Sequence, residues 1–117
     1  MVVNHPSVTV NQLTSAQLRG IYMMRQVIWP DGSPIRVFVL PSDHELHKQF
    51  ARQKLQLFPY QLERGWQKLT YSGTGTPPTE VIDLTEMKLR VSTTPGAIGY
   101  IDSKEQENGL QILQIKP

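Results

Sequence analysis

Apolar residues fall into two patterns along this chain: short continuous runs, and longer segments in which they recur at helical spacing. Ile35–Leu40 is the clearest short run, because it is β-branched and aromatic with one polar interruption, and Pro41 ends it. The other runs are shorter but are also bounded by polar or turn residues. The pattern predicts four strands, at 1–4, 35–40, 97–101 and 110–115.

Four segments have helical spacing, and three of them carry a start signal. Thr14 and Gln17 have the form of a capping box, and so do Ser42 and Glu45. Pro59 suits the first position of a helix. The sequence therefore predicts helices beginning after Thr14, running from Ser42 to about Leu55, beginning at Pro59, and spanning about Leu84 to Val91.

Turn signals separate these elements. The strongest are Trp29–Pro34, the glycine-rich loop Tyr71–Pro78, the Pro95-Gly96 pair and the polar stretch Glu105–Gly109. Gly99 lies inside a predicted strand, which indicates that a backbone or a ligand approaches closely there. Taken in order, the elements predict an α/β fold, a mixed sheet of about four to five strands flanked by helices, in one domain covering residues 1–117.

Composition excludes several classes of function. The chain has no cysteine, which rules out disulfides and thiolate sites. Its formal charge of +2 includes no basic run, so we expect no nucleic-acid binding. No apolar stretch approaches the ~20 residues that span a bilayer. No Ser-His-Asp set, paired carboxylates or redox residue stands out, so we expect neither an enzyme nor a cofactor.

Several stretches resemble the small single-lobe members of a known family, the substrate-binding proteins of phosphate ABC transporters. They are Leu13–Tyr22, Trp29–Ile35, Gly73–Pro78 and Thr94–Tyr100, in the same order and spacing, and Thr-Pro-Gly-Ala-Ile-Gly-Tyr is the most specific. The resemblance implies a single lobe of the type 2 periplasmic-binding-protein fold. It also implies an exported, periplasmic protein from which a signal peptide has been removed.

The resemblance also implies where an anion would bind. In this lobe the family places an Arg-Ser-Asp-Gly-Ser-Gly-Thr loop between a strand and a helix, where backbone N–H groups and the positive helix end hold phosphate. The matching stretch is Leu40–His47, in which Ser42 and Asp43 are kept and the arginine and both glycines are replaced. We therefore take Ser42, Asp43 and His44 as candidate ligand-binding residues.

Each candidate has a structural alternative. Ser42 with Glu45 is explained equally by helix capping, and that is the interpretation the pattern favours. The loop residues Ser72, Gly73, Thr74 and Thr76 form a second candidate, because glycines and hydroxyls suit an anion-binding nest. A plain surface connection explains them as well.

Histidines and aromatic residues have structural alternatives of the same kind. His44 and His47 lie one helical turn apart, but no third ligand is evident, so we expect no metal site. Trp66 lies on a helical apolar stripe and is predicted to be core. Trp29 and Tyr71 occupy turn positions and are predicted to form an exposed patch.

The leading hypothesis is a solute-binding module that captures phosphate or another small oxyanion near Ser42, Asp43 and the Ser72–Thr76 loop. The alternative is a non-catalytic envelope interaction protein. It follows from the replaced arginine and the missing first lobe, because an uncovered lobe face can bind an envelope protein or a second copy of the chain.

Overall fold

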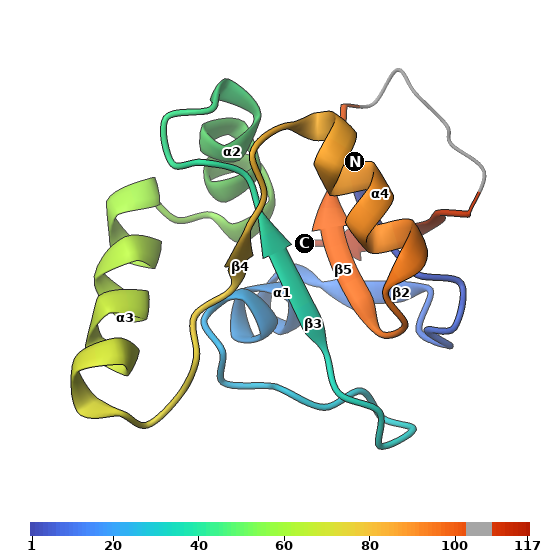
Figure 1. Cartoon of the computed structure of the whole chain (residues 1–117), viewed down its shortest axis with the longest axis horizontal. Coiled ribbons are helices and arrows are strands. Elements are labelled where there is room, and N and C mark those ends of the chain that lie inside the picture. The colour runs from blue at the N-terminus through green and yellow to red at the C-terminus, as the bar shows by residue number, and fades with distance from the viewer. Residues whose placement is uncertain (103–108) are drawn as a thin grey trace.

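The computed structural model, which describes residues 1–102 and 109–117, contains one mixed six-stranded sheet in the order β2-β6-β1-β5-β3-β4 (Figure 1). β3 runs parallel to both β4 and β5, whereas β1 is antiparallel to β5 and β6. β2 joins the far edge, parallel to β6. The strands are β1 (Val2–Asn4), β2 (Gln12–Thr14), β3 (Arg36–Val39), β4 (Thr79–Glu80), β5 (Ala97–Tyr100) and β6 (Gln111–Lys116).

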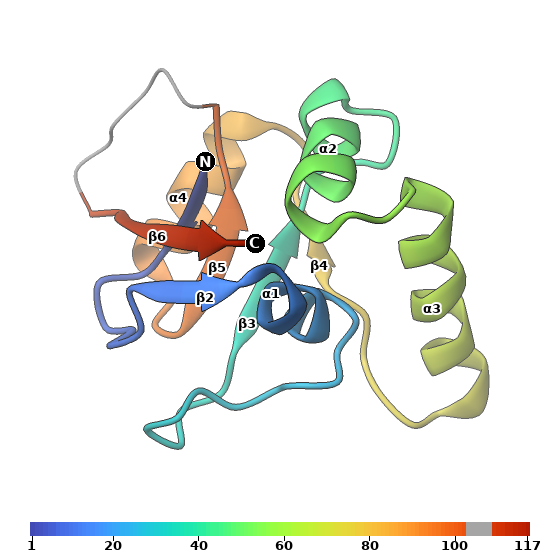
Figure 2. The ribbon, with the colours of Figure 1, turned by 180° about the vertical axis from the view of Figure 1, so that it is seen from behind.

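Helices flank the sheet on both faces, which confirms the predicted α/β class. α4 packs on β5, β3 and β1, and α1 lies on the opposite face (Figures 1 and 2). α3 lies to the side of β4, the edge strand. The helices are α1 (Ser15–Tyr22), α2 (Glu45–Phe50), the π-helical turn η1 (Ala51–Leu55), α3 (Pro59–Ser72) and α4 (Leu84–Thr93).

The four predicted strands correspond to β1, β3, β5 and β6, and the sheet gains two more. β2 and β4 contain three and two residues. Strands this short have no hydrophobic period of their own and are defined by pairing with a neighbour. The first capping box is confirmed, because the Gln17 N–H donates to Thr14 Oγ1 at 3.1 Å and the Thr14 N–H donates to Gln17 Oε1 at 2.9 Å.

The capping box predicted at Ser42 is wrong. The N-cap of α2 is His44, whose Nδ1 accepts a hydrogen bond from the Leu46 N–H at 3.1 Å. α3 also runs further than expected, so Ser72 ends a helix and the loop begins at Gly73, which has φ +65°. The polar turn expected at Glu105–Gly109 lies, apart from its glycine, outside the described residues.

The Pro95-Gly96 turn is held by Trp29, which lies in the core. Gly96 has φ +80°, and its carbonyl accepts a 2.9 Å hydrogen bond from Trp29 Nε1. Trp29 is 2% exposed, so its assignment to an exposed patch is wrong. At Gly99 the close approach is real but comes from α4, because an added Cβ would lie 2.7 Å from Met87 Sδ and 2.9 Å from Val91 Cγ2.

Candidate functional site

Ser42, Asp43 and His44 lie together in the loop that follows the carboxyl end of β3. A backbone bond of 2.9 Å from the His44 N–H to the Pro41 carbonyl turns the chain before α2 begins. Because His44 is the cap, the Ser42 hydroxyl and the Asp43 carboxylate are exposed. Neither side chain has a hydrogen bond to any residue in 1–102 or 109–117.

A cavity of about 460 Å³ lies beside this loop, at the carboxyl ends of β3 and β5. Its charged lining is mixed: Lys54 and Met1, with its terminal ammonium group, line it together with Glu45 and Asp102. Tyr100 and the start of α4 complete the wall. The balance of charges means that this cavity attracts an anion only weakly through long-range electrostatics.

The second candidate loop lies at the other end of the sheet. Ser72 and Thr74 hydrogen-bond to each other through their hydroxyls at 2.7 Å, and the Ser72 hydroxyl also lies 3.3 Å from the Leu69 carbonyl. This loop leads into the amino end of β4, whereas Ser42 follows the carboxyl end of β3, and the two strands are parallel. The structure therefore does not bring the two loops together (Figures 1 and 2).

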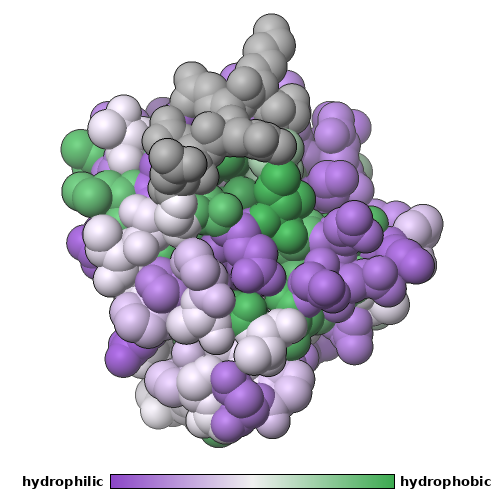
Figure 3. All heavy atoms as spheres, turned by 90° about the vertical axis from the view of Figure 1, so that its right-hand side faces the viewer, coloured by the Kyte–Doolittle hydropathy of each residue, from purple (hydrophilic) through white to green (hydrophobic). Residues whose placement is uncertain are grey.

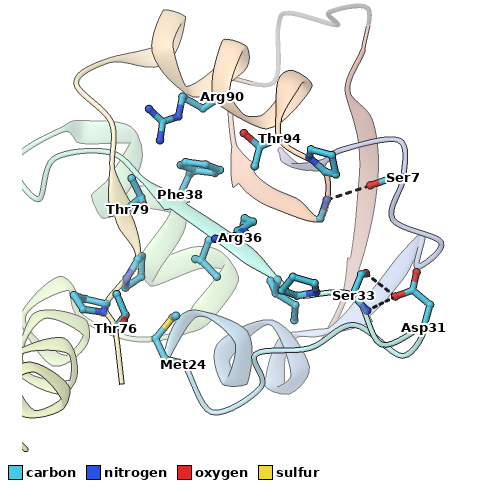
Figure 4. Close-up of a pocket in the computed structure, with 17 residues that line it drawn as sticks. Ser7, Met24, Asp31, Ser33, Arg36, Phe38, Thr76, Thr79, Arg90 and Thr94 are labelled. Atoms are coloured by element: carbon cyan, nitrogen blue, oxygen red, sulfur yellow. Dashed lines mark hydrogen bonds between the residues drawn. The ribbon is translucent and has the colours of Figure 1, made fainter. Parts of the chain in front are cut away.

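Sequence reasoning did not single out a second cavity, which is larger than the one beside the Ser42 loop. It has a volume of about 690 Å³ and lies at the amino ends of β3, β4 and β5 (Figure 4). Arg36 from β3 and Arg90 from α4 line it, together with Thr76, the one candidate residue from the second loop that reaches it. We call this cavity the Arg36–Arg90 groove.

Charge is distributed unevenly along the Arg36–Arg90 groove. The guanidinium carbon of Arg90 lies 5.2 Å above the Phe38 ring at one end. Asp31 lies at the other end, where the N–H and Oγ of Ser33 donate to its carboxylate at 2.9 and 2.6 Å (Figure 4). These hydrogen bonds lower the pKa of Asp31, so its carboxylate stays negatively charged. This negative charge lies at the end of the groove away from Arg90 (Figure 4).

The two histidines considered as a metal pair have separate structural roles. His44 caps α2, and His47 is 1% exposed and hydrogen-bonded through Nδ1 to Tyr100 Oη at 2.6 Å. No group of three or more metal-ligating side chains occurs in the described part of the chain. Trp66 is half-buried against the core, and Tyr71 is 89% exposed as predicted.

Comparison with solved structures identifies proteins that share this fold. Over 97% of its length the chain superposes on a Clostridium perfringens protein of the phosphate ABC transporter substrate-binding class, solved with bound phosphate, with a TM-score of 0.78 and 17% identity. An ABC-type phosphate transport receptor from Vibrio cholerae gives 0.76 and 18% over 97% of the chain, and PstS of Borrelia burgdorferi gives 0.71 and 17% over 97%. The chain has the fold of a single periplasmic-binding-protein-like lobe.

The match covers 43%, 44% and 46% of those three proteins, so this lobe corresponds to less than half of each. No protein-family model matches the sequence, and no curated protein matches it either. At 17–18% identity the likeness concerns the fold and leaves the ligand to be argued from this chain's own residues.

The surface of the described residues carries both apolar and charged areas. In the view of Figure 3, apolar side chains form a central area with polar side chains on either side, and a second apolar area lies at the left edge. Phe58, Tyr60 and Tyr71 on α3 or at its start are more than half exposed. No helix in the described ranges is long and apolar enough to cross a membrane.

Proposed function

We propose that this chain is a non-enzymatic solute-binding module that takes phosphate or a similar small oxyanion at the loop between β3 and α2. The observation that carries the proposal is the fold, since 97% of the chain superposes on a substrate-binding protein solved with bound phosphate. Export to the periplasm belongs to the same proposal, because substrate-binding proteins of transporters act outside the inner membrane.

The position of the loop supports this choice of site. In open α/β sheets, ligands bind in the crevice beyond the carboxyl ends of the strands. Ser42, Asp43 and His44 occupy that place at β3, and of the three His44 lines the cavity at the end of β5. The Ser72–Thr76 loop is left out of this site because it lies at the amino end of β4.

The unpartnered side chains also suit an oxyanion. The Ser42 hydroxyl and the loop N–H groups can donate to anionic oxygens. The Asp43 carboxylate accepts hydrogen bonds only, so it favours an oxyanion that still carries a proton. Phosphate is partly protonated at neutral pH and sulfate is not. The site should therefore prefer phosphate to sulfate.

Calorimetric titration with phosphate and with sulfate tests this site. Ser42→Ala should weaken phosphate binding about ten- to hundredfold, since a hydrogen bond to a charged group contributes about 1.5–3 kcal/mol. Asp43→Asn should reduce the preference for phosphate over sulfate. Thr74→Ala is the matched control, because it removes an exposed hydroxyl from the other loop and should leave both affinities unchanged. No phosphate binding up to millimolar concentration would rule out the proposal.

A second candidate function, protein–protein interaction, is favoured by an exposed row of four side chains. The rings of Phe58 and Tyr60 stack with centroids 5.8 Å apart, and Arg52 and Arg64 each lie 5.7 Å from one of these rings. Aromatic residues and arginine dominate the energetics of protein interfaces. Light scattering of the wild type and of Tyr60→Ala tests association with a second copy, and a strictly monomeric wild type argues against it.

A further inference from the structure

The Arg36–Arg90 groove lies at the opposite end of the sheet from the solute site proposed above. Arg36 begins β3, and Gly96 and Pro95 precede β5, so the lining comes from the amino ends of parallel strands. Thr79, from β4, forms another side of the groove (Figure 4). A ligand there would share no residue with the loop at Ser42.

The two arginines face the same groove because of strand geometry and helix packing. Arg36 and Phe38 are two residues apart on β3, so their side chains project from the same face of the sheet. α4 packs on that face and holds Arg90 above the Phe38 ring. The ring covers one side of the Arg90 guanidinium and leaves its N–H edge free to donate.

Neither arginine is neutralised by a residue that the structure describes. Within residues 1–102 and 109–117, Arg36 and Arg90 form no ion pair. Asp31, a carboxylate in the lining, is held by Ser33 at the far end of the groove (Figure 4). Among the described lining residues, the groove therefore carries two guanidinium charges against the single carboxylate of Asp31, and this net positive charge attracts an anionic group.

Hydroxyl groups and apolar surface complete the lining. Thr76, Thr79 and Thr94 make no side-chain hydrogen bond to the residues that the structure describes, so their hydroxyls are available to a ligand. Phe38 and Pro34, with further prolines, supply apolar walls. The volume of about 690 Å³ lies within the range of about 300–1,000 Å³ typical of sites for organic molecules, and far exceeds what one inorganic anion fills.

We propose that the Arg36–Arg90 groove binds an organic anion, that is, a phosphate or carboxylate group attached to an apolar body. The anionic group lies between the two guanidinium groups, with the threonine hydroxyls donating to it. The apolar body lies against Phe38 and the prolines. This binding is independent of the solute site at Ser42.

NMR titration of the whole chain with small probes tests the proposal. Phenyl phosphate and benzoate distinguish the two anionic groups, while phenol and inorganic phosphate each supply one half of the ligand. We expect phenyl phosphate or benzoate to give saturable shifts at Thr76, Thr79 and Arg90. Phenol and inorganic phosphate should bind the groove with an affinity at least about tenfold lower, measured from the same resonances, because each lacks one of the two contacts.

Arginine variants provide the decisive comparison. Arg36→Gln and Arg90→Gln should each lower the affinity for the organic-anion probe about tenfold, because each removes a charge-assisted hydrogen bond. Arg64→Gln is the matched control, since Arg64 also lies over an aromatic ring, at 5.7 Å from Tyr60, but outside the groove. Ser42→Ala should also leave the groove affinity unchanged, so failure of this proposal is separable from failure of the solute site.

Three results would overturn the proposal. One is the absence of saturable shifts with either organic anion up to millimolar concentration. Another is an equal loss of affinity in Arg64→Gln, which would indicate a general charge effect. The third is inorganic phosphate acting on the groove as strongly as phenyl phosphate, since the apolar body would then contribute nothing.

Discussion

His47 and Tyr100 are joined by a buried hydrogen bond of 2.6 Å between Nδ1 and Oη. The same Oη accepts the Leu40 N–H at 2.9 Å. If the Tyr100 hydroxyl donates to Nδ1, only the His47 Nε2–H lacks a partner. If instead His47 Nδ1–H donated to the Tyr100 hydroxyl, both the hydroxyl hydrogen and His47 Nε2 would lack a partner. We therefore assign the hydroxyl as donor and His47 as the neutral tautomer protonated at Nε2, which has no partner within the described residues.

Removing the Tyr100 hydroxyl should destabilise the fold. Tyr100→Phe leaves the Leu40 N–H and His47 Nδ1 buried without partners, and each costs about 1–3 kcal/mol. We expect the free energy of unfolding, measured with urea, to fall by about 2–6 kcal/mol in total. Tyr60→Phe is the control, because Tyr60 is 57% exposed and should change stability by less than about 0.5 kcal/mol. Equal effects of the two variants would contradict the buried role of Tyr100.

Stability should also depend on the protonation of His47. Burial is the largest effect on His47 and lowers its pKa below the ordinary value of 6.5. The charge of Glu63 raises this pKa, and the neighbouring His44 lowers it further. The unfolded chain therefore takes up a proton at a pH where the folded chain does not. The stabilisation is complete above the ordinary pKa and declines as the pH falls below it.

Urea unfolding between neutral pH and about pH 5 measures this dependence. The wild type should lose stability as the pH falls, and His47→Gln should show a smaller slope, whatever its absolute stability. A slope that is the same in both proteins would show that other groups cause the pH dependence. An NMR titration of the His47 ring gives the pKa directly and should place it below 6.5.

Local sequence signals predicted an element well where the residues that hydrogen-bond to stabilise it are close in sequence. They predicted it less well where those residues are distant in sequence. Thr14 and Ser42 both begin a Ser/Thr-x-x-Glu/Gln motif, but only Thr14 leads directly from a strand into its helix. After β3, the turn closed by the Pro41 carbonyl moves the start of α2 past Ser42 to His44. The motif alone contains no information about that turn.

The same limit applies to the candidate site. The loop at Ser42 was located by its resemblance to the family's phosphate loop, and ligand binding there stays a prediction. The Arg36–Arg90 groove joins two arginines that are distant in sequence, and its one local signal is Arg36 as the single charge in the apolar run Ile35–Leu40. Trp29 was misplaced because a turn position does not reveal the distant Gly96 carbonyl that it bonds.

The close packing of α4 on β5 makes Gly99 sensitive to substitution. The added Cβ of Gly99→Ala would lie 2.7 Å from Met87 Sδ and 2.9 Å from Val91 Cγ2. Met87 can move, but Val91 is β-branched and stiff, so we expect a loss of about 1–3 kcal/mol in the free energy of unfolding. Gly20→Ala, in α1 with no atom within 4 Å of the new Cβ, should instead stabilise by about 0.5–1 kcal/mol. Gly99→Ala as stable as the wild type would contradict this close contact between β5 and α4.

The assignment of His44 as the cap of α2 separates stability from binding at neighbouring residues. His44→Ala removes the acceptor of the Leu46 N–H and should lower the free energy of unfolding by about 1 kcal/mol. Ser42→Ala removes no bond within the described residues and should leave stability within about 0.5 kcal/mol of the wild type. Phosphate titration of the same two proteins completes the test, because weaker binding by a fully stable Ser42→Ala assigns that hydroxyl to a ligand. A loss of stability in Ser42→Ala would restore its role as a helix cap and remove it from the proposed site.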